Sequence, residues 1–135
     1  MIEEQLYREA LLDIYKNPPN RGELLRPDFE AKLLNPLCGD EIKIQVELAN
    51  SETQKEKRKI GKAVFSGNGC AISQASASLL AEFIEGKKLS EIQEIGSDDI
   101  LKLLGITPTP ARMGCALLSL DTLRKALKDA IIERS

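Results

Sequence analysis

Three cysteines and one aspartate are the residues of this chain whose side chains could do chemistry together. Cys38 and Asp40 lie two residues apart in the segment Asn35-Pro36-Leu37-Cys38-Gly39-Asp40, whereas Cys70 and Cys115 lie far away in the sequence. Zinc accepts both thiolate sulfur and carboxylate oxygen as ligands. Three Cys and one Asp would therefore supply the four ligands of a tetrahedral site, provided that the fold brings them together.

The spacing of the cysteines does not by itself indicate a metal site, because zinc fingers use closely spaced pairs that this chain lacks. Free cysteines are also among the most buried residue types, so an ordinary core position stays an alternative for each of them. A site of three thiolates and one carboxylate around a divalent ion would have a net charge of −2. Arg112, three residues before Cys115, either offsets this charge or forms a surface salt bridge.

The composition excludes several classes of function. The chain contains no His, which rules out a Ser-His-Asp triad, a Cys-His dyad and imidazole metal ligands. It also lacks a Cys-x-x-Cys pair, so a thiol hydrolase or oxidoreductase is disfavoured. The net charge is −2, from 19 basic and 21 acidic residues, and therefore no basic field favours nucleic acid.

A length of 135 residues fits one compact domain, which we expect to cover residues 1–135. The apolar runs are too short to cross a bilayer, so no membrane role is expected. The acidic start Met1-Ile2-Glu3-Glu4-Gln5 lacks the basic and apolar regions of a secretory signal. We therefore expect a cytoplasmic protein with reduced cysteines.

Periodicity predicts the elements around these residues. Apolar positions recur with a helical period over residues 3–16, and two prolines after Asn17 end that helix. Alternating patterns predict antiparallel strands over residues 29–34 and 41–49, with a third strand around 59–66. The segment that contains Cys38 and Asp40 would then form the turn between the first two strands.

Helices are predicted over the second half of the chain. The glycine-rich segment before Cys70 opens a helix over residues 71–85, with Gly69 acting as a hinge. One side of this helix contains Ile72, Ala75, Leu79, Leu80 and Phe83, and its many small residues would allow close approach to a sheet or helix. Two short helices follow over 89–95 and 98–104, the second capped by Ser97. A proline-rich, extended segment then leads to a last helix that begins near Cys115.

Cys70 and Cys115 thus both stand at predicted helix starts, where the helix dipole favours the thiolate form that metals and electrophiles require. All three cysteines lie at turns or helix starts rather than within an apolar stripe. This placement favours working thiols over ordinary core positions.

The sequence resembles the U-type iron–sulfur cluster scaffold family, which comprises IscU, SufU and the N-terminal domain of NifU. The resemblance covers nearly the whole chain and rests on four segments. They are Tyr15-Lys16-Asn17-Pro18, Asn35-Pro36-Leu37-Cys38-Gly39-Asp40, Gly69-Cys70-Ala71-Ile72-Ser73 followed by Ala75-Ser76-Ala77-Ser78, and Pro110-Ala111-Arg112 leading to Cys115-Ala116-Leu117-Leu118.

This resemblance implies an α+β fold, with a three-stranded antiparallel sheet on which an N-terminal helix, a long C-terminal helix and others pack. It implies that Cys38, Asp40, Cys70 and Cys115 hold zinc or a nascent 2Fe–2S cluster, supported by Gly39, Gly69 and Arg112. The implied partners are a cysteine desulfurase, which supplies sulfur, and apo iron–sulfur proteins, which receive the product.

Two departures bear on the branch of the family. IscU-like members have a Leu-Pro-Pro-Val-Lys chaperone motif and a His just before the last cysteine, whereas this chain has Thr107-Pro108-Thr109-Pro110-Ala111-Arg112 and Gly114 there. Chaperone handover is therefore not expected. The Pro-Ala-Arg and Ala-Ser-Ala-Ser wording is similar to SufU, although the insertion usual in SufU between the last two cysteines is missing. We expect a SufU-like protein.

Two hypotheses of different classes follow. In the first, Cys38 accepts sulfur from a desulfurase persulfide, because its turn is flanked by Gly39. In the second, the domain binds zinc only to hold its structure and docks partners through its surface, without sulfur transfer. The second hypothesis predicts that removal of the metal unfolds the chain.

Overall fold

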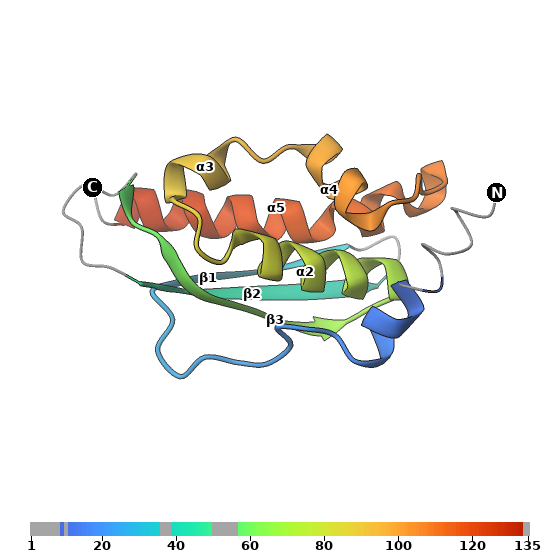
Figure 1. Ribbon diagram of the computed structural model, residues 1–135, viewed down its shortest axis with the longest axis horizontal. Coiled ribbons are helices and arrows are strands. Elements are labelled where there is room, and N and C mark those ends of the chain that lie inside the picture. The colour runs from blue at the N-terminus through green and yellow to red at the C-terminus, as the bar shows by residue number, and fades with distance from the viewer. Residues whose placement is uncertain (1–8, 10, 36–38, 50–56, 134–135) are drawn as a thin grey trace.

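The computed structural model of the chain describes residues 9, 11–35, 39–49 and 57–133, with side chains described as far as residue 128. Its one sheet has the strand order β1-β2-β3, and both neighbouring pairs are antiparallel. Helices cover one face of this sheet (Figure 1). The elements are β1 (Phe29–Asn35), β2 (Asp40–Leu48), β3 (Ile60–Asn68), α2 (Ala71–Ile84), α3 (Leu89–Gln93), α4 (Ser97–Leu104) and α5 (Pro110–Glu133). The α+β fold is confirmed.

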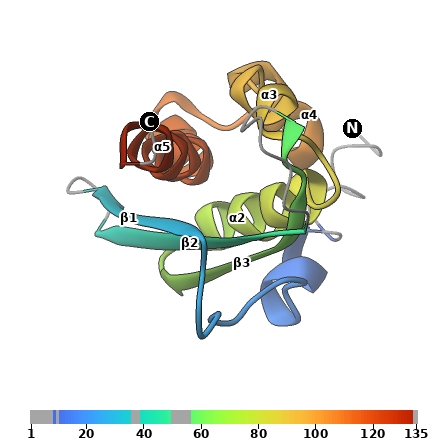
Figure 2. The ribbon, with the colours of Figure 1, turned by 90° about the vertical axis from the view of Figure 1, so that its left-hand side faces the viewer.

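The core lies between the sheet and the helices α2 and α5. Figure 2 shows α5 over β1 and β2, α2 over β2 and β3, and α3 and α4 on the side of these helices away from the sheet. Alternation along β2 directs Ile42, Ile44 and Val46 into the core, and all three are fully buried. A slip of one residue would expose this set, so burial of one face fixes the register in which Ile44 pairs with Ala31 and Phe65.

The N-terminal segment protects an edge of the sheet. Residues 11–16 are helical, which confirms the part of the predicted helix that the structure describes. The chain then runs beside β3, where the Phe65 backbone N–H donates to the Asn20 carbonyl (2.9 Å) and the Gly22 N–H donates to the Phe65 carbonyl (3.0 Å). Sequence patterns did not predict this contact. These hydrogen bonds pair backbone groups of the edge strand that would otherwise be exposed.

Several predicted boundaries were wrong. Asn35 and Asp40 belong to the paired strands rather than to the turn, and β3 extends to Asn68. Gly96, not Ser97, is the N-cap of α4; its N–H donates to the Asp99 carboxylate at 2.8 Å. Glycine is one of the residues favoured at a helix N-cap, where the backbone is extended rather than helical.

The buried face of α2 agrees only in part with the predicted one, of which Ala75 and Leu80 are fully buried. Ile72, Leu79 and Phe83 are only partly buried, whereas the small residues are enclosed because α2 packs against both the sheet and α5. The fully enclosed positions include Ala77, Leu80, Ala81 and Ile84. Helix α2 thus buries small residues together with the large apolar residues Leu80 and Ile84.

The predicted start of the last helix was wrong as well. Helix α5 begins at Pro110, so Cys115 lies in its second turn rather than at its start. Proline fits the first turn of a helix, because the N–H that it lacks would have no intrahelical partner there. Among the described residues, no helix has both the length and the apolar composition needed to cross a bilayer.

Candidate metal centre

Asp40 is a buried carboxylate at the first position of β2. Its side chain is on the same face as Ile42, two residues further on, and therefore points toward the helices. Gly39 makes the approach possible: its φ of +74° closes the turn, and its N–H donates to the Asn35 carbonyl at 2.8 Å. Only 3% of Asp40 is exposed, so its oxygens need partners inside the fold.

Cys70 supplies one of these partners. It is the N-cap of α2 and its backbone N–H donates to Asp40 Oδ1 at 3.1 Å. Its Sγ lies 3.6 Å from Asp40 Oδ2. The prediction that Cys70 stands at a helix start is confirmed, and the thiol is half-buried beside the carboxylate.

Cys115 reaches the same place because α2 and α5 pack closely. The buried Ser76 hydroxyl donates to the Ala116 carbonyl (2.7 Å) and shares a hydrogen bond with the Ser119 hydroxyl (2.8 Å). These contacts fix the residue next to Cys115 against α2. Cys115 is 1% exposed. The expectation that small residues allow close helix approach is confirmed here.

The three donor atoms form a compact group. One ligand atom from each of Asp40, Cys70 and Cys115 lies within 4.8 Å of the others. Around a tetrahedral zinc, a sulfur at about 2.3 Å and an oxygen at about 2.1 Å would be separated by about 3.6 Å. The observed separation between Cys70 Sγ and Asp40 Oδ2 is also 3.6 Å. The donor set therefore suits a thiolate–carboxylate site in its chemistry, and this one distance, which also allows a thiol hydrogen bond, is compatible with tetrahedral zinc.

Gly69 and Ser73 surround the carboxylate. A Cβ on Gly69 would come within 2.9 Å of Asp40 Cγ and within 2.5 Å of Ser73 Oγ, so only glycine leaves room for both side chains. The Ser73 hydroxyl donates to the Cys70 carbonyl at 3.0 Å and lies 3.9 Å from Cys70 Sγ. Sequence reasoning missed Ser73. Its place three residues after the helix N-cap is the signal that could have found it, since that position faces back toward the cap.

Cys38 lies outside the described residues, and its place in the site stays a prediction. Its sequence position is two residues before Asp40. Arg112 is exposed and forms no ion pair with any described residue, so the predicted surface salt bridge is not found there.

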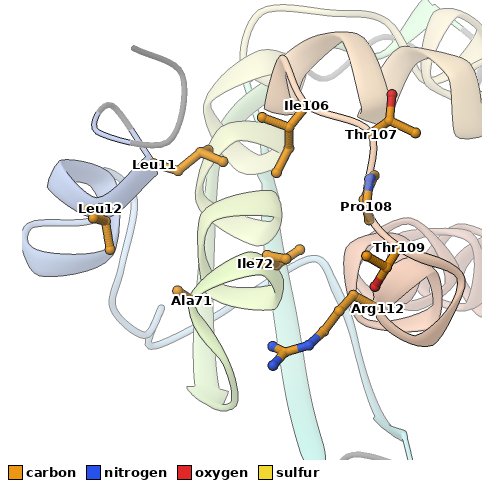
Figure 3. Close-up of a pocket in the computed structure, with 9 residues that line it drawn as sticks. All are labelled: Leu11, Leu12, Ala71, Ile72, Ile106, Thr107, Pro108, Thr109 and Arg112. Carbon is orange, nitrogen blue, oxygen red and sulfur yellow. The ribbon is translucent and has the colours of Figure 1, made fainter. Parts of the chain in front are cut away.

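An apolar pocket of about 310 Å³ adjoins the centre. In Figure 3, the Arg112 side chain extends from α5 toward the N-terminal end of α2, where Ala71 and Ile72 are labelled. The guanidinium therefore points toward the helix end that bears Cys70, rather than away from the protein. Leu11 and Leu12 of the N-terminal helix also line this pocket. Arg112 is thus placed on the side of the molecule where the ligand atoms meet.

The four segments that build the centre lie at one end of the molecule. Figure 1 shows the end of β1, the start of β2, the start of α2 and the start of α5 together at its right-hand side. The first of them, the end of β1, and the last, the start of α5, are about 75 residues apart in the chain. Only the antiparallel turn and the α2–α5 contact bring these positions together.

Comparisons with known proteins show the relatives of this chain. The family model described as the NifU-like N terminal domain matches residues 6–132. The zinc-dependent sulfurtransferase SufU of Bacillus subtilis is 34% identical, over 92% of this chain and 90% of the relative. The iron–sulfur cluster assembly scaffold protein IscU of Rickettsia prowazekii is 33% identical, over 91% of this chain and 90% of the relative.

A solved structure has the same fold. It is the N-terminal part of a nitrogen-fixing NifU-like protein from Brucella abortus, which is 21% identical and superimposes with a TM-score of 0.70. The alignment covers 96% of each chain.

Proposed function

The chain belongs to the family of NifU-like N-terminal domains, and from this membership we propose that it is an iron–sulfur cluster assembly protein. As a single domain, it accepts sulfur from a cysteine desulfurase and holds zinc or a nascent 2Fe–2S cluster. The observation that supports this function is the convergence of Asp40, Cys70 and Cys115, whose ligand atoms lie within 4.8 Å of one another.

The proposed ligands are Cys38, Asp40, Cys70 and Cys115. Cys38 lies two residues before Asp40 in the sequence. Two residues of extended chain span at most about 7 Å, so the Cys38 side chain can reach the same centre. Gly39 and Gly69 support the ligands through the turn conformation and the space beside the carboxylate. Arg112 is the cation that would balance the negative charge of the site, because its side chain extends toward the start of α2 (Figure 3).

Sulfur acceptance is a thiolate reaction. The Cys38 thiolate attacks the outer sulfur of the desulfurase persulfide, an S–S bond forms on Cys38, and the desulfurase cysteine leaves as a thiolate. A bound zinc ion would keep the coordinating thiols deprotonated. Of the two cysteines that the structure describes, Cys70 is half-buried and Cys115 is buried. We propose Cys38 as the acceptor because it directly precedes Gly39 in the segment between β1 and β2.

The sequence favours the SufU-like branch, in which the protein is a zinc-dependent sulfurtransferase working with its desulfurase. The relative from Bacillus subtilis bears that name. Gly114 stands where IscU-like members have His, and a Cβ there would lie 3.2 Å from Asn35 Nδ2. A histidine at this position would therefore have to displace Asn35. The sulfur or cluster then passes to apo iron–sulfur proteins. This transfer does not use the Leu-Pro-Pro-Val-Lys chaperone motif, which this chain lacks.

A purely structural zinc domain is the alternative. It is disfavoured because a cluster of 25 buried hydrophobic residues, counted over the part of the chain that the structure describes, joins the sheet to the helices and includes no proposed ligand. A domain with this core has a source of stability independent of the metal.

The test combines occupancy with sulfur transfer. Elemental analysis and an absorption spectrum of anaerobically purified protein distinguish a colourless, zinc-loaded protein from a brown, cluster-loaded one. We expect one zinc per chain. The purified protein is then mixed with a cysteine desulfurase, cysteine and a persulfide-specific alkylating probe.

Cys38→Ala should abolish both persulfide labelling and stimulation of the desulfurase. Asp121→Ala, which removes an exposed carboxylate of α5, is the control for handling and should behave like the wild type. If Cys38→Ala keeps full labelling, Cys38 is not the acceptor. If the wild type takes up neither metal nor sulfur, the proposed function is wrong.

A further inference from the structure

A second depression, of about 400 Å³, lies next to the metal centre. Gly69 lines this depression and also lies against Asp40 of the centre. The N-terminal helix, the end of β3 and the first turn of α2 meet there, as the right-hand side of Figure 1 shows. The residues that line it include two cations, one buried amide, one aromatic ring and one proline. They are Lys16, Arg21, Gln74, Tyr15 and Pro18, together with residues 67–69.

The two cations at this depression are not neutralised within the described protein. The ion pairs of the described residues join Lys32 to Glu41 and Lys43 to Glu23, and no carboxylate pairs with Lys16 or Arg21. Two positive charges therefore face the same hollow without a counter-charge. A negatively charged ligand would be attracted there.

Arg21 is held in place before any ligand arrives. Its Nη1 donates to Gln74 Oε1 at 2.7 Å, its Nη2 donates to the Gly67 carbonyl at 3.3 Å, and its guanidinium lies 5.7 Å from the centre of the Phe65 ring. The backbone on either side is fixed to β3 by the hydrogen bonds of Asn20 and Gly22. Little conformational entropy remains for this arginine to lose on binding.

Gln74 supplies the observation that indicates a ligand. Its side chain is 4% exposed, and its Oε1 accepts from Arg21, which leaves the amide Nε2 as the group free to donate. Among the described residues, this Nε2 is the buried side-chain polar atom without a hydrogen-bond partner. Leaving a buried donor unpaired costs about 1–3 kcal/mol, so an acceptor that reached this amide from the depression would remove that cost.

The shape and lining of the depression define the class of ligand. Lys16, Arg21 and Gln74 bring N–H donors to the lining, which suit a carboxylate. Tyr15 and Pro18 line the same depression and offer carbon surface that an organic acid can contact and an inorganic ion cannot use. Its volume lies at the lower end of ordinary ligand pockets, about 300–1,000 Å³. We propose that this depression binds a small organic acid through its carboxylate. The inference does not depend on the proposed function, because none of these side chains is a metal ligand.

Equilibrium dialysis of the whole chain, as purified, against radiolabelled succinate, at constant ionic strength, tests the proposal. We expect saturable binding of one succinate per chain, with inorganic phosphate competing more weakly. Absence of saturable binding up to about 10 mM succinate would overturn the proposal, since affinity beyond that is negligible. Stronger binding of phosphate than of succinate would overturn the assignment to an organic acid.

Variants locate the bound succinate. Gln74→Leu removes the unpaired amide and Lys16→Ala removes an exposed cation, and each should weaken binding about tenfold. Lys16→Ala removes no hydrogen bond or ion pair of the described protein, so it tests the proposal even if Gln74→Leu folds poorly. Arg26→Ala, an exposed arginine outside the depression, is the control and should bind normally. If Asp40→Ala abolishes binding while Gln74→Leu and Lys16→Ala retain it, succinate binds at the metal and the proposal is wrong.

Discussion

Gly69→Ala should damage the metal centre without changing a ligand. The φ of Gly69 lies outside the left-handed region, so alanine fits the local backbone. Its Cβ, however, would lie 2.9 Å from Asp40 Oδ1 and 2.5 Å from Ser73 Oγ. Normal contact begins at about 3.4 Å, so the carboxylate must shift by about 0.5 Å and the hydroxyl by about 0.9 Å.

These shifts have a predictable size in free energy. The hydrogen bond from the Cys70 N–H to Asp40 joins a donor to a charged acceptor, and such bonds contribute about 1.5–3 kcal/mol. Alanine also restricts the unfolded chain, which stabilises the fold by about 0.4–1 kcal/mol. We therefore expect the free energy of unfolding to fall by about 1–2 kcal/mol. Displacement of a ligand's support typically lowers metal affinity by about 10- to 100-fold.

Two assays separate these effects. Urea unfolding of metal-free protein measures the free energy of unfolding, and competition with a chromophoric chelator measures zinc affinity. Gly96→Ala is the matched control, because a Cβ at Gly96 meets no atom within 4 Å and Gly96 lies at the start of α4. It should leave zinc affinity unchanged. If Gly69→Ala binds zinc as tightly as the wild type, the close packing of Gly69 against Asp40 does not control the ligand, and this reasoning is refuted.

Three further predictions concern the core and the metal. Ser76→Ala removes the buried hydroxyl that joins α2 to Ser119 of α5, and it should lower the free energy of unfolding in urea by about 1–2 kcal/mol. The control Ser97→Ala changes an exposed residue and should lower it by less than about 0.5 kcal/mol. Equal effects would contradict the bridging role of Ser76. Leu80→Ala should cost about 2–5 kcal/mol because Leu80 is fully buried, with the fully exposed Leu25→Ala near zero in the same assay. Removal of metal by a chelator should leave a cooperative melting transition by circular dichroism, because the hydrophobic cluster that joins the sheet to the helices includes no proposed ligand. Loss of that transition would favour a structural zinc domain.

Local patterns predicted the strands of the sheet well. Ile42, Ile44 and Val46 alternate with the polar residues Lys43 and Gln45, and this period of two predicted which face of β2 meets the core. The element ends were predicted less well. Pairing extended β3 to Asn68, and Pro110 began α5 where the proline-rich segment had suggested extended chain. Strand ends depend on a partner strand, and that information is not local.

The candidate site shows the same division. The residue types selected Cys70 and Cys115, because thiols remain as metal ligands in a chain without His. Asp40 was selected by its place two residues after Cys38 and by the family resemblance, not by its type. The glycine before Cys70 was recognised as a hinge, but its close contact with Asp40 was not. That contact joins residues about 30 positions apart, and the periodicity of one segment does not report it.

The sequence by itself thus determined the chemistry that this protein can perform and the elements from which it is built. The tertiary structure decided whether that chemistry is assembled in one place. The antiparallel register places Asp40 on the helical face, and the Ser76 contact between α2 and α5 brings Cys115 to Cys70. It also decided that Gln74 is buried with an unpaired amide, because burial depends on what packs around a residue and not on its neighbours in the chain.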